Sequence, residues 1–268
     1  MPISARTDLM ALMRGAEPVV AEAAATLVAM QRAPLATARK ELRDIVTDAD
    51  LAAERIVIDG LRSLTPGAAI LSEERGFSGN TSGPRWIVDP LDGTVNYASG
   101  LPWYSVSAAY HDGDEALVGL VQSPLADVCA RYVHGALATV NGEPVRVSST
   151  RSLSDAVVSV ILTSHYQPDE VRTAAAIIER LGSAVRGVRI VVSGALEMTW
   201  IAAGRLDAFV SIKADLVSHA AAMPLVRAAG GRVTTIAGEA SQFDDLQKIA
   251  SNGHVHDELL RLLEEIAL

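Results

Sequence analysis

The chain has 268 residues, a formal net charge of −9 and 49% hydrophobic residues. This size can bury a substantial core, and an acidic balance without a Lys/Arg cluster argues against nucleic-acid and anionic-membrane partners. Its one cysteine, Cys129, cannot form an intrachain disulfide, and no apolar stretch has the length of a signal peptide core or a membrane span. We therefore expect a globular, cytoplasmic protein, and three lysines among many arginines and alanines are typical of a GC-rich bacterial genome.

Apolar periodicity predicts two N-terminal helices, over 9–31 and 48–64, and Thr47 is the expected N-cap of the second. Short strands are expected at 68–71 and 86–88, and residues 77–84 between them are expected to form a mobile loop. Further strands follow, with a turn at Asn141-Gly142, at 103–111, 116–122, 127–133, 136–140 and 145–148.

After about residue 150, strands and helices alternate, which is typical of a layered α/β unit. Strands are expected at 157–162, 187–192, 207–212, 231–236 and 247–251. Helices are expected at 169–181, 194–204, 219–229 and 254–266. The pattern divides the chain into an N-terminal α+β half (1–150) that carries the acidic motifs and a C-terminal α/β half (151–268) that completes a substrate pocket.

The most informative segment is W-I-V-D-P-L-D-G-T-V-N-Y at 86–97, with Glu73 upstream. Asp89 and Asp92 can face one site only if the chain turns sharply, which Pro90 and Gly93 favour. Carboxylate oxygens are ligands that Mg²⁺ prefers, and backbone amides after Asp92 can hold an anion. The segment therefore predicts magnesium-dependent phosphate chemistry. The alternative is an ordinary Asx-type turn with exposed acids.

This segment closely resembles the first signature of the inositol monophosphatase family, W-x-x-D-P-x-D-G-T-x-N-F/Y. The resemblance extends over nearly the whole chain, through D-I-V-T-D-A-D at 44–50, S-E-E at 72–74, G-L-V-Q-S-P-L-A-D at 119–127, S-G-A-L-E at 193–197 and the segment around Ala220-Ala221. It implies a layered αβαβα sandwich, a homodimer, and a phosphatase that uses two or three Mg²⁺ ions.

Carried over by position, the resemblance implies that Glu73, Asp89, the Leu91 carbonyl and Asp92 bind metal. Glu73 and Thr94 would hold the attacking water, with Asp50 orienting Thr94; the alternative for Asp50 is a solvated acid in the first turn of a helix. The expected substrate-binding residues are Gly93, Thr94, Ser193, Gly194, Ser211 and Ser218.

The second signature of the family begins W-D-x-A-A, but Val217 and Ser218 occupy its first two positions here. A ligand of the second metal is therefore missing, so that site should be weakened. Ser218 is expected to act as the N-cap of the following helix, while Asp215 and His219 are candidates for partial replacement.

Substrate-facing positions differ as well. Ser211 stands where the family's inositol-binding enzymes have Glu, Val192 where they have Gly, and Ser99 where they have His. His254 and His256 have ligand-like spacing, but a surface pair at the start of a helix is the favoured interpretation.

These features predict a Mg²⁺-dependent phosphomonoesterase acting on a small phosphorylated metabolite. The expected substrate is a sugar, polyol or amino-alcohol phosphate other than myo-inositol 1-phosphate. One alternative is a family member that binds a phosphorylated ligand without hydrolysis. Another is a biosynthetic enzyme that expels phosphate toward an internal nucleophile.

Overall fold

The computed structural model describes residues 3–32, 36–39, 44–80, 83–214, 217–264 and 266, with side chains from residue 8 onward. Its helices are α1 (Ile3–Gln31), α2 (Asp48–Leu64), α3 (Thr94–Ala98), α4 (Pro168–Ala184), α5 (Gly194–Ala202), α6 (Met223–Ala228) and α7 (His256–Leu263), with a 3₁₀ turn at Leu153–Asp155. Its strands are β1 (Thr37–Arg39), β2 (Ile45–Thr47), β3 (Ala69–Ser72), β4 (Gly76–Ser78), β5 (Arg85–Asp92), β6 (Ser105–Asp112), β7 (Glu115–Ser123), β8 (Val128–Val133), β9 (Leu137–Val140), β10 (Glu143–Pro144), β11 (Val157–Val160), β12 (Gly187–Arg189), β13 (Ala208–Ser211), β14 (Arg232–Thr234) and β15 (Lys248–Ser251).

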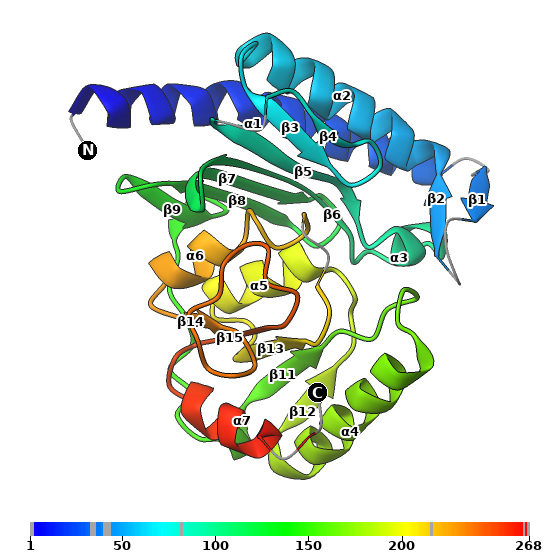
Figure 1. The fold of residues 1–268 in the computed structure, drawn as a ribbon, viewed down its shortest axis with the longest axis vertical. Coiled ribbons are helices and arrows are strands. Elements are labelled where there is room, and N and C mark those ends of the chain that lie inside the picture. Colours follow the sequence, from blue (N-terminus) through cyan, green and yellow to red (C-terminus); the bar gives the residue numbers. More distant parts are fainter. Residues whose placement is uncertain are drawn as a thin grey trace.

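Five layers build the molecule (Figure 1). Helices α1 and α2 cover one face of an eight-stranded sheet with strand order β10-β9-β8-β7-β6-β5-β3-β4. Helices α5 and α6 lie between this sheet and a five-stranded sheet of order β12-β11-β13-β15-β14. Helices α4 and α7 cover the outer face of the second sheet. This arrangement confirms the expected αβαβα sandwich.

Strand β5 shows how the sequence assigns side chains to two cores. Trp86 and Val88 pack toward α1 and α2, whereas Ile87 packs with the core that contains α5 and α6. Successive strand residues point to opposite faces of a sheet, and both faces of this sheet are covered by helices, so an uninterrupted apolar run is required. Asp89 therefore projects toward the middle helical layer, which belongs to the second half of the chain.

Most expected elements are present with ends shifted by a few residues, and α2 begins after Thr47 as predicted. The Thr47 hydroxyl accepts from the amides of Ala49 and Asp50, which is the expected N-cap geometry. The Asn141-Gly142 turn is also confirmed, since both residues have positive φ (53° and 84°) between β9 and β10.

Three expectations were wrong, and one element was missed. Residues 145–148 form no strand: the Val145 amide still donates to the Ala138 carbonyl of β9 at 3.1 Å, but the Val147 amide turns away to the Ala229 carbonyl. Part of the expected loop 77–84 belongs to β4, which pairs with β3. The β1–β2 hairpin was not expected. The helix expected at 219–229 begins only at Met223, and residues 217–222 form turns. Among the described residues, no helix is both long and apolar enough to cross a bilayer.

Candidate active site

A β-bulge in β5 brings the two aspartates of the motif to one face of the sheet. Asp89 pairs with Ser107 and Asp92 pairs with Ser105, so β5 has one residue more than β6 between these pairs. In a regular strand, residues three apart point to opposite faces, and one extra residue restores the same face. Pro90 lies inside the bulge, where a missing amide hydrogen is tolerated. The turn predicted from Pro90 and Gly93 is thus a bulge followed by a turn.

Gly93 makes the turn that ends β5 and begins α3. Its φ is 94°, and a side chain there would lie 2.8 Å from the Trp103 carbonyl oxygen. Only glycine fits both constraints. From the short helix that follows, the Asn96 amide donates to the carbonyls of Trp103 (2.8 Å) and Val191 (2.7 Å). Asn96 therefore fixes the segment before α5 against the end of β5.

Asp92 connects the first sheet to the middle helical layer. Its Oδ2 accepts from the Ser105 hydroxyl (3.1 Å), the Ser193 hydroxyl (2.7 Å) and the Ala195 amide (3.0 Å), and its Oδ1 accepts from the Gly194 amide (3.1 Å). The carboxylate thus caps the N-terminus of α5 from outside that helix, where the amides and the helix dipole favour negative charge.

Asp50 is fully buried and reaches Thr94 from α2. Its Oδ2 accepts from the Thr47 amide (2.8 Å), which completes a capping box, and its Oδ1 accepts from the Thr94 hydroxyl (3.0 Å). The Thr94 hydroxyl also lies 3.1 Å from the Leu91 carbonyl. Asp50 is therefore not a solvated helix acid, because its carboxylate orients the Thr94 hydroxyl.

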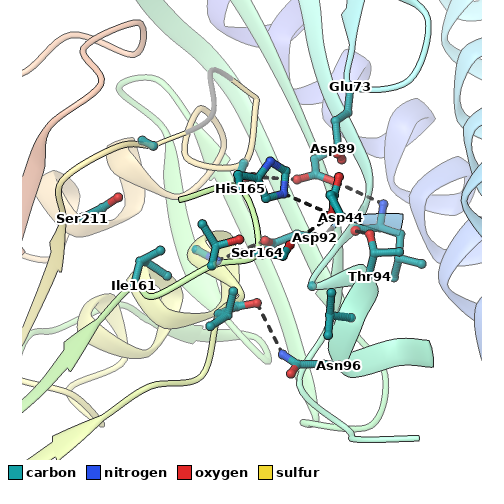
Figure 2. A pocket seen from close by; sticks show the side chains of 18 of the residues that line it. Asp44, Glu73, Asp89, Asp92, Thr94, Asn96, Ile161, Ser164, His165 and Ser211 are labelled. Carbon is teal, nitrogen blue, oxygen red and sulfur yellow. Dashed lines mark hydrogen bonds and ion pairs between the residues drawn. The ribbon is translucent and has the colours of Figure 1, made fainter. Parts of the chain in front are cut away.

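The carboxylates meet in a cavity of about 280 Å³ at the boundary of the two sheets (Figure 2). Glu73, Asp89 and Asp92 line it together with Leu91, Gly93 and Thr94. Asp44, which precedes β2, adds a fourth carboxylate that was not expected here. Its Oδ1 contacts the Ser164 hydroxyl and His165 Nε2, both at 3.3 Å, from the segment after β11. Asp44 thus joins the two halves of the chain across the cavity.

Ser218 interacts directly with Asp89. Its hydroxyl donates to Asp89 Oδ2 at 2.7 Å, while Asp89 Oδ1 accepts from the Leu91 amide at 3.1 Å. Ser218 is therefore not the N-cap of α6, which begins five residues later. This hydrogen bond engages a carboxylate oxygen that Asp89 would otherwise offer to a metal ion. Asp215 lies outside the described residues.

His219 lines the same cavity and packs edge-on against Phe209, with ring centroids 5.3 Å apart. A side chain at Gly194 would collide with the His219 ring, so this glycine permits the close approach of the ring to α5. Ser211, at the end of β13, is buried beside the Tyr166 hydroxyl and reaches the cavity from the second sheet.

Glu197 supports this region from inside α5. It is fully buried and accepts from the Ser193 amide (2.9 Å) and the Ser159 hydroxyl. Burial raises its pKa to about 8, and the nearby Asp92 charge adds to this effect. The raised pKa favours the neutral form of Glu197, which lessens its repulsion with the Asp92 carboxylate.

The donors fit a hard cation that retains part of its water shell. Four acidic residues and Leu91 border one cavity, and carboxylate and carbonyl oxygens suit Mg²⁺. Within the described ranges, no three Asp, Glu, His or Cys side chains already enclose an ion position. Mg²⁺ does not need such a cage, because one or two carboxylates, water and a substrate phosphate complete its coordination.

The structure brings most of the nominated residues to this cavity, with Ser193 and Asp50 just behind its lining, while Asp215 lies outside the described residues. Sequence reasoning missed Asp44 as a lining residue, even though the D-x-V-T motif contained it. It also missed the segment 161–165 and Asn96. The residues after β11 carry no sequence signal, because only the fold brings them to the carboxylates.

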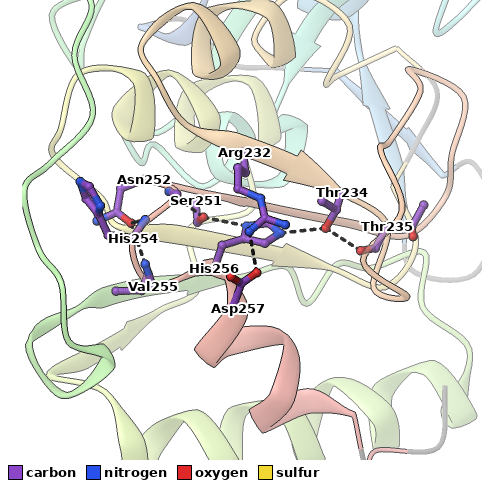
Figure 3. Close-up of polar contacts among 10 residues, drawn as sticks. Arg232, Thr234, Thr235, Ser251, Asn252, His254, Val255, His256 and Asp257 are labelled. Atoms are coloured by element: carbon purple, nitrogen blue, oxygen red, sulfur yellow. Dashed lines mark hydrogen bonds and ion pairs between the residues drawn. The ribbon is translucent and has the colours of Figure 1, made fainter.

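His254 and His256 lie elsewhere (Figure 3). His256 is fully buried rather than a surface residue, with Nδ1 2.7 Å from the Ser251 hydroxyl and Nε2 2.9 Å from the Thr234 hydroxyl. The favoured interpretation was therefore wrong for His256, which connects β14 and β15 to the start of α7.

A family model described as the inositol monophosphatase family matches residues 8–268. The fructose-1,6-bisphosphatase/inositol-1-monophosphatase of Thermotoga maritima is 36% identical over 84% of this chain and 84% of its own. The inositol-1-monophosphatase of Mesorhizobium japonicum is 32% identical over 83% of this chain and 84% of its own. The Nus factor SuhB of Pasteurella multocida is 31% identical over 87% and 88%, respectively.

Solved structures share this fold over nearly their whole length. The Thermotoga maritima IMPase superposes with a TM-score of 0.85 at 32% identity, over 93% of this chain and 95% of its own. The extragenic suppressor protein suhB of Bartonella henselae gives a TM-score of 0.88 at 31% identity, over 96% and 99%.

Proposed function

Because the chain belongs to the inositol monophosphatase family, a family of phosphatases, we propose that it is a Mg²⁺-dependent phosphomonoesterase. The observation that carries this proposal is the convergence of Glu73, Asp89 and Asp92 on one cavity beside Thr94. The substrate is a small phosphorylated metabolite. We further propose that the protein acts as a homodimer.

Each residue has a proposed role that follows from its contacts. Glu73, Asp89, Asp92 and the Leu91 carbonyl hold the cations. When bound, Mg²⁺ lowers the pKa of water and offsets phosphate charge. The Thr94 hydroxyl donates to Asp50 Oδ1 at 3.0 Å, so the lone pairs of the Thr94 oxygen remain available to accept a hydrogen bond from a water. Gly93 and Thr94 amides bind phosphate oxygens.

Ser218 weakens the second metal position before substrate arrives. Three carboxylates carry three negative charges, two Mg²⁺ ions carry four positive charges, and a phosphate monoester carries about two negative charges. The loaded site sums to about −1, so two ions remain compatible with three acids. Since Ser218 supplies a hydroxyl that donates to Asp89, the second ion depends more strongly on phosphate oxygens.

Phosphate release from a panel of phosphorylated metabolites tests this function. We expect hydrolysis that requires Mg²⁺ and falls by ~10²-fold or more in Asp89→Asn and Glu73→Gln. The neighbouring acid offers a matched control, because Glu74 does not line the cavity and Glu74→Gln should keep its activity. Turnover that persists without divalent cations, or is unchanged in Glu73→Gln, would contradict the proposal.

Two observations favour a second candidate, a protein that binds a phosphorylated ligand without hydrolysing it. Ser218 replaces an acid at the site, and similar chains include proteins named Nus factor SuhB. Because of those relatives, we do not extend the expected absence of nucleic-acid partners to this chain. Saturable Mg²⁺-dependent phosphate binding with no phosphate release from any ester would favour this candidate.

A further inference from the structure

Val192 has a backbone conformation that a β-branched residue rarely adopts. Its φ is 61°, in the left-handed region, where the side chain crowds the following carbonyl. The other described non-glycine residues with positive φ are Asp127 and Asn141, whose short polar side chains tolerate this region. The Val192 side chain is branched and apolar, so contacts with its surroundings must impose the conformation.

Contacts on both sides of Val192 hold it in place. Asn96 Nδ2 donates to the Val191 carbonyl at 2.7 Å and lies 3.3 Å from the Val192 carbonyl. On the other side, Asp92 accepts from the Ser193 hydroxyl at 2.7 Å and from the Gly194 amide at 3.1 Å. A strained residue that is fixed by such contacts at a functional site indicates a role for its position.

Val192 lies on an aliphatic wall of the cavity. Val95, Ile161 and Leu162 line the cavity with it, whereas the carboxylates belong to other segments. Figure 2 shows Ile161 apart from the cluster formed by Glu73, Asp89 and Asp44. Two polar side chains next to this segment are already engaged, since the Asn96 amide donates to backbone carbonyls and the Ser193 hydroxyl donates to Asp92. A substrate hydroxyl beside Val192 would therefore lose hydrogen bonds to water without replacement.

We propose that Val192 is a specificity-determining residue whose isopropyl group favours phosphate esters with an apolar carbon skeleton over fully hydroxylated ones. This inference rests on the proposed function, because it assumes that the phosphate group binds beside Gly93. It assigns the substrate to phosphate monoesters of partly deoxygenated or alkyl-bearing alcohols.

Two esters with the same ring test this assignment: cyclohexyl phosphate, which has no hydroxyls, and myo-inositol 1-phosphate, which has five. Their dissociation constants are measured by titration calorimetry with Mg²⁺ in Thr94→Ala, a background that keeps every carboxylate but should not turn over. Val192→Gly opens the wall and suits a positive φ, while Val192→Thr keeps the shape and adds a hydroxyl.

We expect Thr94→Ala to bind cyclohexyl phosphate more tightly than myo-inositol 1-phosphate. Either substitution of Val192 in this background should shift the ratio of the two dissociation constants ~10-fold in favour of the inositol ester. A ratio that changes less than ~2-fold in both double variants, or no binding of either ester, would overturn the inference. Binding is measured separately from hydrolysis. If only the phosphatase proposal fails, the ratio of the two dissociation constants still shifts as expected, but the wild type releases no phosphate.

Thermal unfolding adds a readout that is independent of ligands. Val192→Gly relieves backbone strain, so its Tm should stay within ~2 °C of the wild type or rise. Val191→Gly is the matched control, because Val191 is buried next to it without a positive φ, and its Tm should fall by ~5 °C or more. Equal losses in the two variants would contradict the strain on which the inference depends.

Discussion

Ser218 stands one hydrogen bond from Asp89, so a single substitution can restore a carboxylate at the second metal position. We expect Ser218→Asp to raise Mg²⁺ affinity ~10-fold by adding a negative charge beside the cation. Calorimetric titration with Mn²⁺ or Mg²⁺ measures this directly. Ser218→Ala is the comparison, since it removes the hydroxyl without adding charge. If affinity is equal in Asp and Ala variants, Ser218 does not face the ion.

At the residue scale, sequence reasoning works where the chemistry is local in the chain. The offsets of Asp89, Asp92 and Thr94 within one motif were sufficient to nominate them, because their chemistry is local in the chain. The contact of Ser218 with Asp89 could not be predicted in this way. It spans 129 positions and replaces the expected role of Ser218 as a helix cap.

At the scale of elements, the β5–α3 turn depends on Gly93. Gly93→Ala should unfold more easily by ~2 kcal/mol than Gly100→Ala, in addition to losing activity. Both glycines have positive φ, but a side chain on Gly93 would meet the Trp103 carbonyl oxygen at 2.8 Å, whereas one on Gly100 would have no neighbour within 4 Å. Urea unfolding of the two variants isolates this steric clash. Equal losses would mean that the turn can relax.

The contact between β14, β15 and α7 makes stability depend on pH through His256. Burial lowers the pKa of His256 to about 4, from an ordinary value of 6.5. Between these values the unfolded chain binds more protons than the folded chain, so the free energy of unfolding should fall as pH drops from 6.5 toward 4.

This loss is expected to reach ~2 kcal/mol for His256, and His111, whose pKa burial also lowers to about 4, adds to it. Glu197 acts in the opposite direction above pH 4.5, because its raised pKa favours the protonated folded form at lower pH. Urea unfolding at pH 4.5, 5.5 and 6.5 should therefore give a shallower slope in His256→Asn than in the wild type. Parallel slopes would show that His256 does not contribute to the pH dependence of the free energy of unfolding.

Element types were easier to predict than element ends. The second helix and its Thr47 cap follow from local signals, namely a capping residue and helical periodicity. The bulge at Pro90, the short edge strand β4 and the late start of α6 depend on pairing and packing partners far away in the chain. No local pattern of residues specifies such partners.

At the scale of the whole molecule, the cavity lies where the two sheets and the middle helical layer meet. The 161–165 segment contacts the carboxylates only through this arrangement, which explains why the sequence could not nominate it. Ligands that bind here connect both halves of the chain. We expect Mg²⁺ with inorganic phosphate at ~100 times its Kd to raise the free energy of unfolding by ~2.7 kcal/mol.

For a chain of this length, that gain corresponds to a Tm increase of ~5–10 °C in a thermal scan. Asp89→Asn should show little of this increase, while Glu74→Gln should show all of it. An increase of equal size in Asp89→Asn would place the ligands elsewhere.

The most direct test of the whole account is a crystal structure with Mn²⁺ and phosphate bound, with the metal located by its anomalous scattering. We predict Mn²⁺ in contact with Asp89, Asp92 or Glu73 and the Leu91 carbonyl, with phosphate oxygens at Gly93 and Thr94. Anomalous density that is absent from this cavity at saturating Mn²⁺ and phosphate, or that lies only at surface acids, would contradict it.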